Sequence, residues 1–335
     1  MTDITQTAAV IHGSRWSRTL RRLGRNLLCA LATGYILFVF SERLFWTAWR
    51  PGDSLVDQSV TWLVYSVAAY QFLAVIAWSR ANDFWSVFLA GAFYGWIIEG
   101  GLIYTLYGTE PSAPFPVSIS ITGLAWHASI SVMVGWWATG RALTASRPRQ
   151  LVWISLAIGI FWGLWAMFLL RETPPIVTPV PVFLANAALL TLGLMASWWV
   201  SFRAGVREFR PSGFGIVLCT LVIGLFFVQH VRMLGVLPLV VFPIALSLAL
   251  VPLYRHRRYA KLSSASNLFS GSFHASRLPI MGLIPCVATV VYCLAAASGM
   301  DRLPINVIVY YVLTGPIGFL LLILAICVSI RRVRA

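Results

Sequence analysis

Long apolar runs recur along the whole chain, and short polar links separate them. Most runs hold about 20 residues, which is the length that an α-helix needs to cross the hydrocarbon core of a bilayer. The runs are residues 27–45, 59–79, 84–106, 117–138, 150–170, 180–201, 213–231, 236–254, 279–299 and 304–329. The pattern predicts an all-α fold, a polytopic transmembrane helix bundle of about ten spans that forms one domain over residues 27–329.

The composition supports the same class of protein. Apolar residues make up 59% of the 335 residues and charged residues only 10%, whereas a soluble domain is about one quarter charged. A larger core does not explain this shortfall, because a soluble surface would still need charge. We therefore expect a surface that meets lipid.

Several motifs of enzymes and metal sites are missing from the sequence. It has no P-loop, no HExxH and no GxSxG motif, which disfavours an ATP-driven pump or a hydrolase with a soluble head. The five cysteines lie inside apolar runs and form no CxxC or Cys/His group. We expect neither disulfides nor a metal site, and no cofactor is predicted.

Basic residues alternate from link to link. Residues 1–26, 80–83, 139–149, 202–212, 255–278 and 330–335 together hold 20 of the 25 lysines and arginines. By the positive-inside rule these segments face the cytoplasm, so we expect cytoplasmic N- and C-termini and a location in the cell (inner) membrane. The formal net charge of +15 then serves topology and contact with anionic membrane lipids on the cytoplasmic face. Nucleic-acid binding is not expected.

Three of these basic segments are predicted to lie outside the bundle. Residues 1–26 interleave arginines with apolar residues at helical spacing, as in a helix that lies on an anionic membrane surface. Residues 255–278 are basic and then Ser-rich, which is typical of a flexible cytoplasmic loop. Residues 330–335 form a basic tail.

Two neighbouring apolar runs each carry one ionisable residue at a depth where lipid would not tolerate it. Glu99 lies about seven residues, or roughly 10 Å, from the outer end of its run. His127 lies about ten residues, or roughly 15 Å, from the outer end of the next run. A link of about ten residues joins the two runs, so we expect antiparallel neighbours with both groups in the outer half of the membrane.

Small residues recur at intervals of four beside each ionisable residue: Gly91 and Gly95 before Glu99, and Gly123, Ser131 and Gly135 around His127. Positions four apart share nearly one face of an α-helix. Small residues at this spacing allow close approach of two membrane helices. The two packing faces therefore carry Glu99 and His127, and the pair is predicted to meet. It would act as a proton relay or an acid/base couple, or else as a buried hydrogen bond that only fixes packing.

Other polar groups are predicted to gather in the same outer half. The candidate substrate-binding residues are Tyr104, Trp126, Asn186, Gln229, His230 and Arg232. Arg171 and Glu172 end another run on that side, where interfacial anchoring is the simpler explanation.

The pattern leaves three classes of function open. The first is a secondary transporter or permease for a small or lipophilic solute, with Glu99 and His127 as proton-coupling groups. The second is an intramembrane enzyme that acts on a lipid-like substrate from the outer leaflet, with the same pair as acid and base and with Arg171, His230 or Arg232 on a head group. The third is a structural or assembly protein without chemistry.

Overall fold

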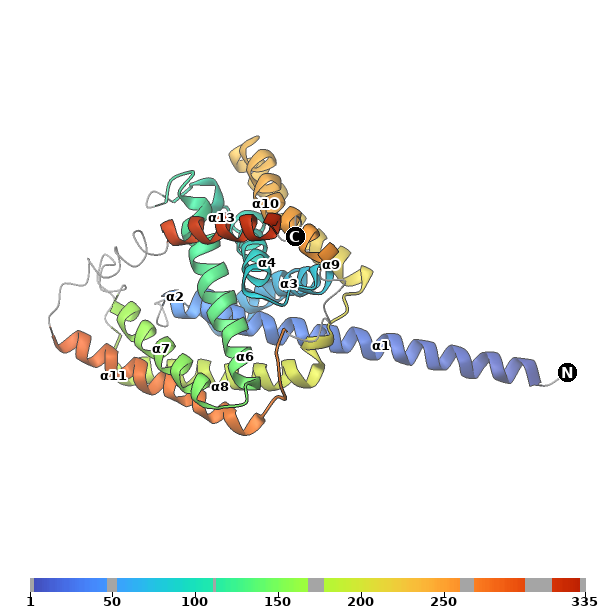
Figure 1. Ribbon diagram of the computed structural model, residues 1–335, viewed down its shortest axis with the longest axis horizontal. Helices are drawn as coiled ribbons and strands as arrows, with labels where there is room; N and C mark the ends of the chain where they lie inside the picture. Colours follow the sequence, from blue (N-terminus) through green and yellow to red (C-terminus); the bar gives the residue numbers. More distant parts are fainter. Residues whose placement is uncertain are drawn as a thin grey trace.

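The computed structural model describes residues 3–46, 53–110, 113–167, 178–259, 268–298 and 315–331. These residues form helices joined by short links and contain no strand (Figure 1). Among them are seven helices that are long and apolar enough to cross a membrane. They are Leu20–Trp46, Leu55–Ser79, Ser118–Thr144, Val180–Ala204, Gly213–Leu234, Leu237–Arg258 and Ala275–Ala297. The predicted all-α class, with several apolar helices, is therefore confirmed.

The elements follow one another in this order: α1 (Asp3–Phe38), η1 (Val39–Arg43), α2 (Leu44–Trp46), α3 (Leu55–Ser79), α4 (Phe84–Trp96), η2 (Ile97–Leu102), η3 (Thr105–Tyr107), α5 (Ser118–Ser120), η4 (Ile121–Ala138), α6 (Thr139–Thr144), α7 (Arg149–Trp165), α8 (Val180–Ala204), η6 (Val206–Glu208), α9 (Gly213–Leu234), α10 (Leu237–Tyr259), η9 (Ala275–Gly282), α11 (Leu283–Ala297) and α13 (Gly315–Arg331). Of these, η1, η2 and η4 are π-helical, and η3, η6 and η9 are 3₁₀ helices.

Each predicted apolar run coincides with helix in the part that the structure describes. Three of the ten runs are not among the seven long helices. Two of these correspond to the shorter apolar helices α7 and α13. The third corresponds to α4 and η2, which continue one another over residues 84–102. Every residue from Ser86 to Leu102 is buried, so this stretch forms the centre of the bundle.

The N-terminal basic segment is helical from Asp3 onward and continues into the first apolar run. Helix α1 runs without a break from Asp3 to Phe38, and Figure 1 shows its N-terminal part projecting away from the other helices. The first proline of the chain is Pro51, and arginine and leucine are both good helix formers. Nothing local therefore ends the helix before the first apolar run begins.

The segment predicted as a loop after residue 254 is described over residues 255–259 and 268–278. Helix α10 continues to Tyr259. Phe269 is 1% exposed, and its ring packs against Trp136 and Trp198. Arg277 donates to the carbonyl oxygen of Ala145 and, at 3.2 Å, to that of Ser146. The basic and Ser-rich composition gave no indication that the ring of Phe269 packs into the bundle.

Helix α1 lies between two groups of helices. On one side it packs against α8, which packs with α11, and α11 packs closely against α7. On the other side α1 packs against α3, and α4 and η4 form a tight pair that α10 and α13 cover. Figure 1 shows α7, α8 and α11 below α1, with α4, α10 and α13 above it.

Hydrogen bonds between distant segments lie at both ends of the bundle. At one end, Arg25 and Asn26 bond to carbonyl oxygens of Ala204 and Arg210, and His256 lies 3.4 Å from the carbonyl oxygen of Arg80. At the opposite end, Trp165 donates to the carbonyl oxygen of Phe45 and Ser120 donates to that of Gly315. The chain thus crosses the bundle repeatedly from one end to the other.

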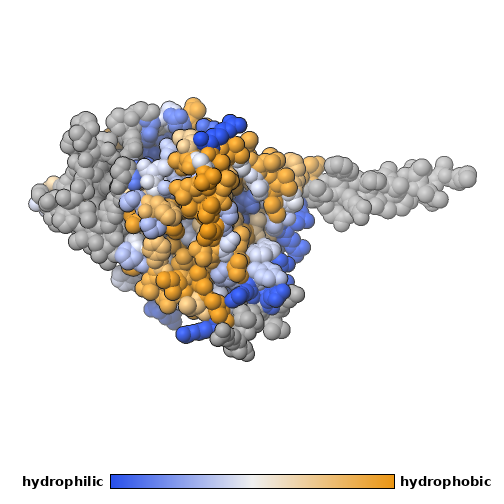
Figure 2. Space-filling model, turned by 90° about the horizontal axis from the view of Figure 1, so that it is seen from above, coloured by the Kyte–Doolittle hydropathy of each residue, from blue (hydrophilic) through white to orange (hydrophobic). Residues whose placement is uncertain are grey.

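Large apolar side chains cover much of the outside of this bundle. Figure 2 shows one face on which hydrophobic side chains form a broad area, with hydrophilic side chains at its margins. On α10, for example, Val240, Ile244 and Leu248 are 55%, 56% and 41% exposed. Burial within the chain does not account for so many exposed aliphatic groups, whereas lipid contact does.

Candidate functional site

The site lies where α4 and η2 pack against η4. A Cβ atom added at Gly95 would lie 2.2 Å from the carbonyl oxygen of Gly123, so the two backbones touch at this point. A Cβ added at Gly91 would lie 3.1 Å from the Cα of Ala128. The small-residue face of the first helix therefore packs as the sequence predicts, and it brings Glu99 beside the second helix.

Gly135 departs from the predicted face. A Cβ added there would meet the ring of Phe40 at 2.5 Å, so Gly135 faces η1 rather than α4. The reason is the helix type, because Ile121–Ala138 is π-helical and its turns hold more residues than those of an α-helix. A stripe of positions four apart consequently drifts around the axis along this element.

All three segments that carry the site are π-helical. Ser41 and Glu42 lie in η1, Glu99 lies in η2, and His127 lies in η4. π-helical turns are rare, and they are frequent at functional sites because they re-aim side chains relative to an α-helix. Residue spacing in the sequence gave no signal for them.

Glu99 and His127 form a short hydrogen bond in the interior. The Nε2 atom of His127 lies 2.5 Å from Oε1 of Glu99, and the two residues are 3% and 5% exposed. The hydroxyl of Thr105 donates to Oε2 of the same carboxyl group. The contact predicted from the sequence is therefore present, and both carboxyl oxygens have a polar partner. Burial of an ionisable pair requires such partners.

The other nitrogen of His127 extends the network toward α1. Its Nδ1 atom lies 2.9 Å from the hydroxyl oxygen of Ser41. Ser41 in turn donates to the hydroxyl of Ser131 at 2.9 Å and lies 3.5 Å from the hydroxyl of Tyr94. Three stretches far apart in the sequence thus meet in one chain of hydrogen bonds.

The direction of the Ser41 bond determines which proton can move. Because Ser41 donates its only proton to Ser131, it accepts from His127, and Nδ1 of His127 carries hydrogen. That hydrogen stays in place whether the proton in the 2.5 Å contact lies on Nε2 or on Oε1 of Glu99. The pair can therefore change from an imidazolium–carboxylate pair to a neutral pair without any side chain turning.

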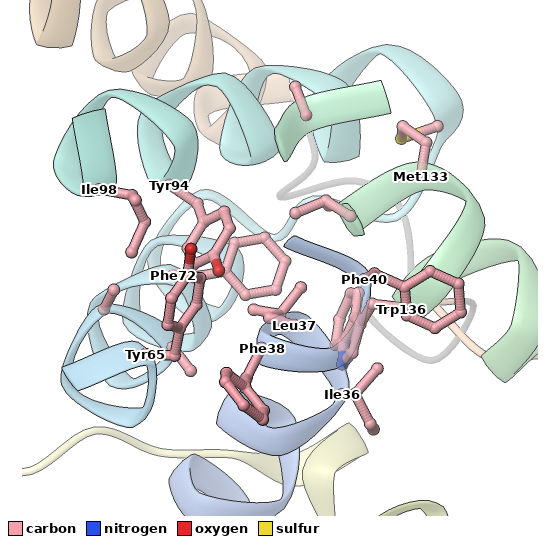
Figure 3. Packing of buried hydrophobic residues seen from close by; sticks show 14 of the residues in the cluster. Ile36, Leu37, Phe38, Phe40, Tyr65, Phe72, Tyr94, Ile98, Met133 and Trp136 are labelled. Carbon is pink, nitrogen blue, oxygen red and sulfur yellow. The ribbon is translucent and has the colours of Figure 1, made fainter. Parts of the chain in front are cut away.

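A second carboxyl group lies close to this network. Glu42 accepts a hydrogen bond of 2.9 Å from the hydroxyl of Tyr65. The rings of Tyr65 and Tyr94 lie 6.4 and 5.8 Å from the imidazole of His127, and the Tyr94 ring stands edge-on to it. Figure 3 shows both tyrosines among the buried side chains of the core, beside Phe72. Among the described residues, no group of three His, Cys, Asp or Glu side chains could hold a metal ion.

Glu42, Tyr65, Ser41 and Thr105 were not among the residues predicted from the sequence. Glu42 belongs to the polar triplet Ser41–Arg43 inside the end of the first apolar run, and that triplet was the available signal. Its neighbour Arg43 is 7% exposed and binds Asp53 at 3.3 Å and Gln58 at 2.8 Å. The triplet therefore has polar partners of its own and does not simply mark the end of a span.

His230 lies on the other side of η2 from His127's helix. Its Nδ1 atom is 3.2 Å from the carbonyl oxygen of Gly100, which also accepts a 2.6 Å bond from the hydroxyl of Tyr107. The rings of Tyr104 and Tyr107 lie 5.7 and 6.3 Å from the His230 ring. Tyr104 is 39% exposed, so this cluster connects the backbone next to Glu99 with the surface of the bundle.

The remaining predicted binding residues do not join this group. Trp126 is buried, but its indole nitrogen donates to the carbonyl oxygen of Phe40 and its ring packs against Phe45 and Trp165. Asn186 is half-buried in α8, which packs mainly against α1 and α11.

Two further candidates on α9, Gln229 and Arg232, are exposed, unlike His230 between them. Arg171 and Glu172 lie outside the described residues. Of the six predicted binding residues, His230 and Tyr104 thus form a cluster with each other beside Gly100, the residue that follows Glu99.

No protein-family model, no curated protein and no solved structure matches this chain. The function is therefore argued from the site itself.

Proposed function

We propose that the chain is a multi-pass protein of the cell (inner) membrane with about ten spans and cytoplasmic termini. The apolar helices, the exposed aliphatic surface and the alternation of basic links support this topology. In this orientation the Glu99–His127 pair lies toward the outer side. The basic end of the bundle, with Arg25 and Arg80, faces the cytoplasm and its anionic lipids.

Within that class, we propose a secondary transporter or permease for a small or lipophilic solute, coupled to protons through Glu99 and His127. The observation that carries this proposal is the 2.5 Å contact between two ionisable groups in the interior. A buried pair of this kind is a functional site by default in a membrane protein, because lipid-embedded charge is costly. The network around it lets the proton change sites without rearrangement of the donors.

The coupling follows from the charge separation of the two states. The imidazolium–carboxylate pair has a large dipole, whereas the neutral pair has a small one, so the two states favour different packing of the surrounding helices. Gly95 and Gly123 allow the two helices that carry the pair to touch. Pro243 and Pro252 interrupt α10, which packs against α4, and broken or kinked helices are frequent in transporters.

The test is solute-driven proton movement in proteoliposomes. The purified full-length chain is reconstituted with a pH dye inside the vesicles, a potential is imposed with potassium and valinomycin, and a panel of small amphiphilic solutes is added outside. We expect an interior pH change with at least one solute, and its loss in Glu99→Gln and His127→Gln. Thr289→Val, in α11, is the control, because Thr289 bonds only to its own helix at Pro285. Uptake without a pH change, or a pH change that survives both substitutions, contradicts proton coupling.

An intramembrane enzyme that acts on a lipid-like substrate is the second candidate. The exposed Tyr104 ring beside His230 favours it, because this cluster reaches the surface close to Glu99 rather than at the midplane. Here Glu99 and His127 would serve as acid and base. Incubation with a total lipid extract and mass spectrometry distinguish the two, since an enzyme consumes a lipid in a Glu99-dependent way and a transporter does not. A structural protein predicts neither result, and it predicts that the two variants fail to accumulate.

A further inference from the structure

A cavity of about 510 Å³ lies at the opposite end of the bundle from Glu99. One wall is formed by successive turns of α1, and the other by the end of α8 and the segment that follows it. Arginines line it: Arg21, Arg22 and Arg25 from α1, and Arg210 from the facing segment. The acidic residue in the lining is Glu208, so the formal charge of the lining is four positive less one negative, or +3.

Hydrogen bonds to backbone carbonyls hold the α1 side of the cavity. The Nε atom of Arg25 donates to the carbonyl oxygen of Ala204 at 3.0 Å. The Nη2 atom of Arg22 donates at 3.3 Å to the carbonyl oxygens of both Arg210 and Pro211, and buried Asn26 donates to Arg210 at 2.8 Å. These bonds position two guanidinium groups and use one nitrogen of each. A guanidinium has five N–H donors, so further donors remain for another acceptor.

Gly205 makes room for Arg25. Its φ of +81° places it in the left-handed region, and a Cβ there would lie 2.3 Å from Nη2 of Arg25. Any side chain would therefore displace the guanidinium from the end of α8. The arginines of the cavity are exposed to solvent, and backbone carbonyls hold Arg22 and Arg25 in place at its wall.

Concentrated positive charge of this kind is unfavourable without an anion. The carbonyl groups at the end of α8 offset part of the repulsion, since a helix C-terminus carries partial negative charge. Guanidinium groups match phosphate oxygens in geometry and bind them through paired N–H donors. The volume is larger than a phosphate needs and leaves room for the rest of a head group.

The depth of the cavity suggests where the phosphate comes from. The first membrane-crossing candidate begins at Leu20, directly beside Arg21 and Arg22. Arginines at the first turn of a span lie at the level of lipid head groups. We propose that this cavity binds a phosphate group, supplied by the head group of an anionic phospholipid. The proposal rests on the membrane class of the protein and does not depend on the chemistry of Glu99 and His127.

The experiment uses the full-length chain in a neutral maltoside detergent and a phosphate-free buffer. The thermal unfolding midpoint is titrated with dioctanoyl phosphatidylglycerol, with dioctanoyl phosphatidylcholine, and with inorganic phosphate. Arg210→Gln removes one side chain from the cavity and keeps the backbone carbonyl that Arg22 and Asn26 use. Arg203→Gln is the matched control, because Arg203 lies near this end, in the last turn of α8, but over the Trp199 ring and outside the cavity.

We expect phosphatidylglycerol to raise the midpoint, with an affinity about tenfold lower in Arg210→Gln, the size of one charge-assisted hydrogen bond. Arg203→Gln should bind like the unmodified chain. Glu208→Gln should bind several-fold more tightly, because it removes a like charge from the anion's site, and a purely structural role of the cavity predicts no such gain.

If inorganic phosphate raises the unfolding midpoint as much as phosphatidylglycerol does, the site is supported and free phosphate is identified as its ligand. Equal effects of phosphatidylcholine and phosphatidylglycerol, with none from inorganic phosphate, would overturn the proposal. An equal loss of affinity in Arg203→Gln and Arg210→Gln would overturn it as well.

Discussion

The contact between Gly95 and Gly123 makes Gly95→Ala the sharpest test of how the site is assembled. The added methyl group would lie 2.2 Å from the carbonyl oxygen, 2.9 Å from the carbonyl carbon and 3.0 Å from the Cα atom of Gly123. All three are backbone atoms, so no side-chain rotation relieves the clash. The two helices must separate instead.

The size of the effect follows from that geometry. Ordinary contact begins near 3.4 Å, so the backbones must move apart by 3.4 less 2.2, or 1.2 Å, at this point. Overpacking of this kind costs about 1–3 kcal/mol. The bond between Glu99 and His127 joins the same two helices, each residue four positions from its glycine, and at 2.5 Å it cannot absorb such a separation and stay short. We expect Gly95→Ala to lower both stability and activity.

The matched control is Gly224→Ala in α9. A Cβ there has nothing within 4 Å, so the substitution adds no clash and gains up to about 1 kcal/mol of helix propensity. Both substitutions replace a helical glycine, so the gain in helix propensity cancels and the two variants should differ by the cost of the clash, about 1–3 kcal/mol. Unfolding by sodium dodecyl sulfate titration in mixed micelles, followed by circular dichroism, measures this difference. Equal stability of the two variants would refute the close approach of α4 and η4.

Two further predictions concern the same region. Glu99→Leu and His127→Leu should each cost about 3–5 kcal/mol, because each leaves a buried partner unpaired, while the double variant should cost much less than their sum. Additive losses in the same unfolding assay would show that the pair is not coupled. Trp126→Phe should cost about 1–3 kcal/mol more than Trp136→Phe, because only the Trp126 indole donates to a buried carbonyl, that of Phe40, whereas the Trp136 nitrogen has no partner. Both are buried tryptophans of η4 that lose the same atoms, so equal losses would contradict the role of that bond.

Much of the bundle could be predicted because a bilayer imposes a length on its helices. The ends of the apolar runs agree with the observed helices within a few residues for α3, α8 and α9, where polar or glycine residues mark the boundaries. The meeting of Glu99 with His127 followed from two small-residue faces and a short link. These signals are local, and they do not depend on helices elsewhere in the chain.

What the sequence did not show depends on backbone geometry and distant partners. The π-helical turns that aim Ser41 and His127 at each other have no residue signature, so the predicted packing face of the second run was extended too far when it included Gly135. Ser41 is 86 residues from His127 in the sequence, and only the packing of η1 on η4 brings it there. The aromatic anchor Phe269 was hidden in a Ser-rich segment for the same reason.

The distribution of the network along the chain has a consequence for biogenesis. The polar triplet in η1 is synthesised long before the helices that complete the site, and the partners of Arg43, Asp53 and Gln58, follow only 10 and 15 residues later. Synthesis proceeds from the N-terminus, so this local closure can protect the triplet while the rest of the chain is still in the ribosome. Of the two hydrogen-bond partners of Glu99 described above, Thr105 is synthesised first and His127 follows within residues 118–138. A nascent chain arrested before η4 would therefore hold an unpaired carboxyl group in the membrane, and we expect it to be retained by the insertion machinery until His127 arrives.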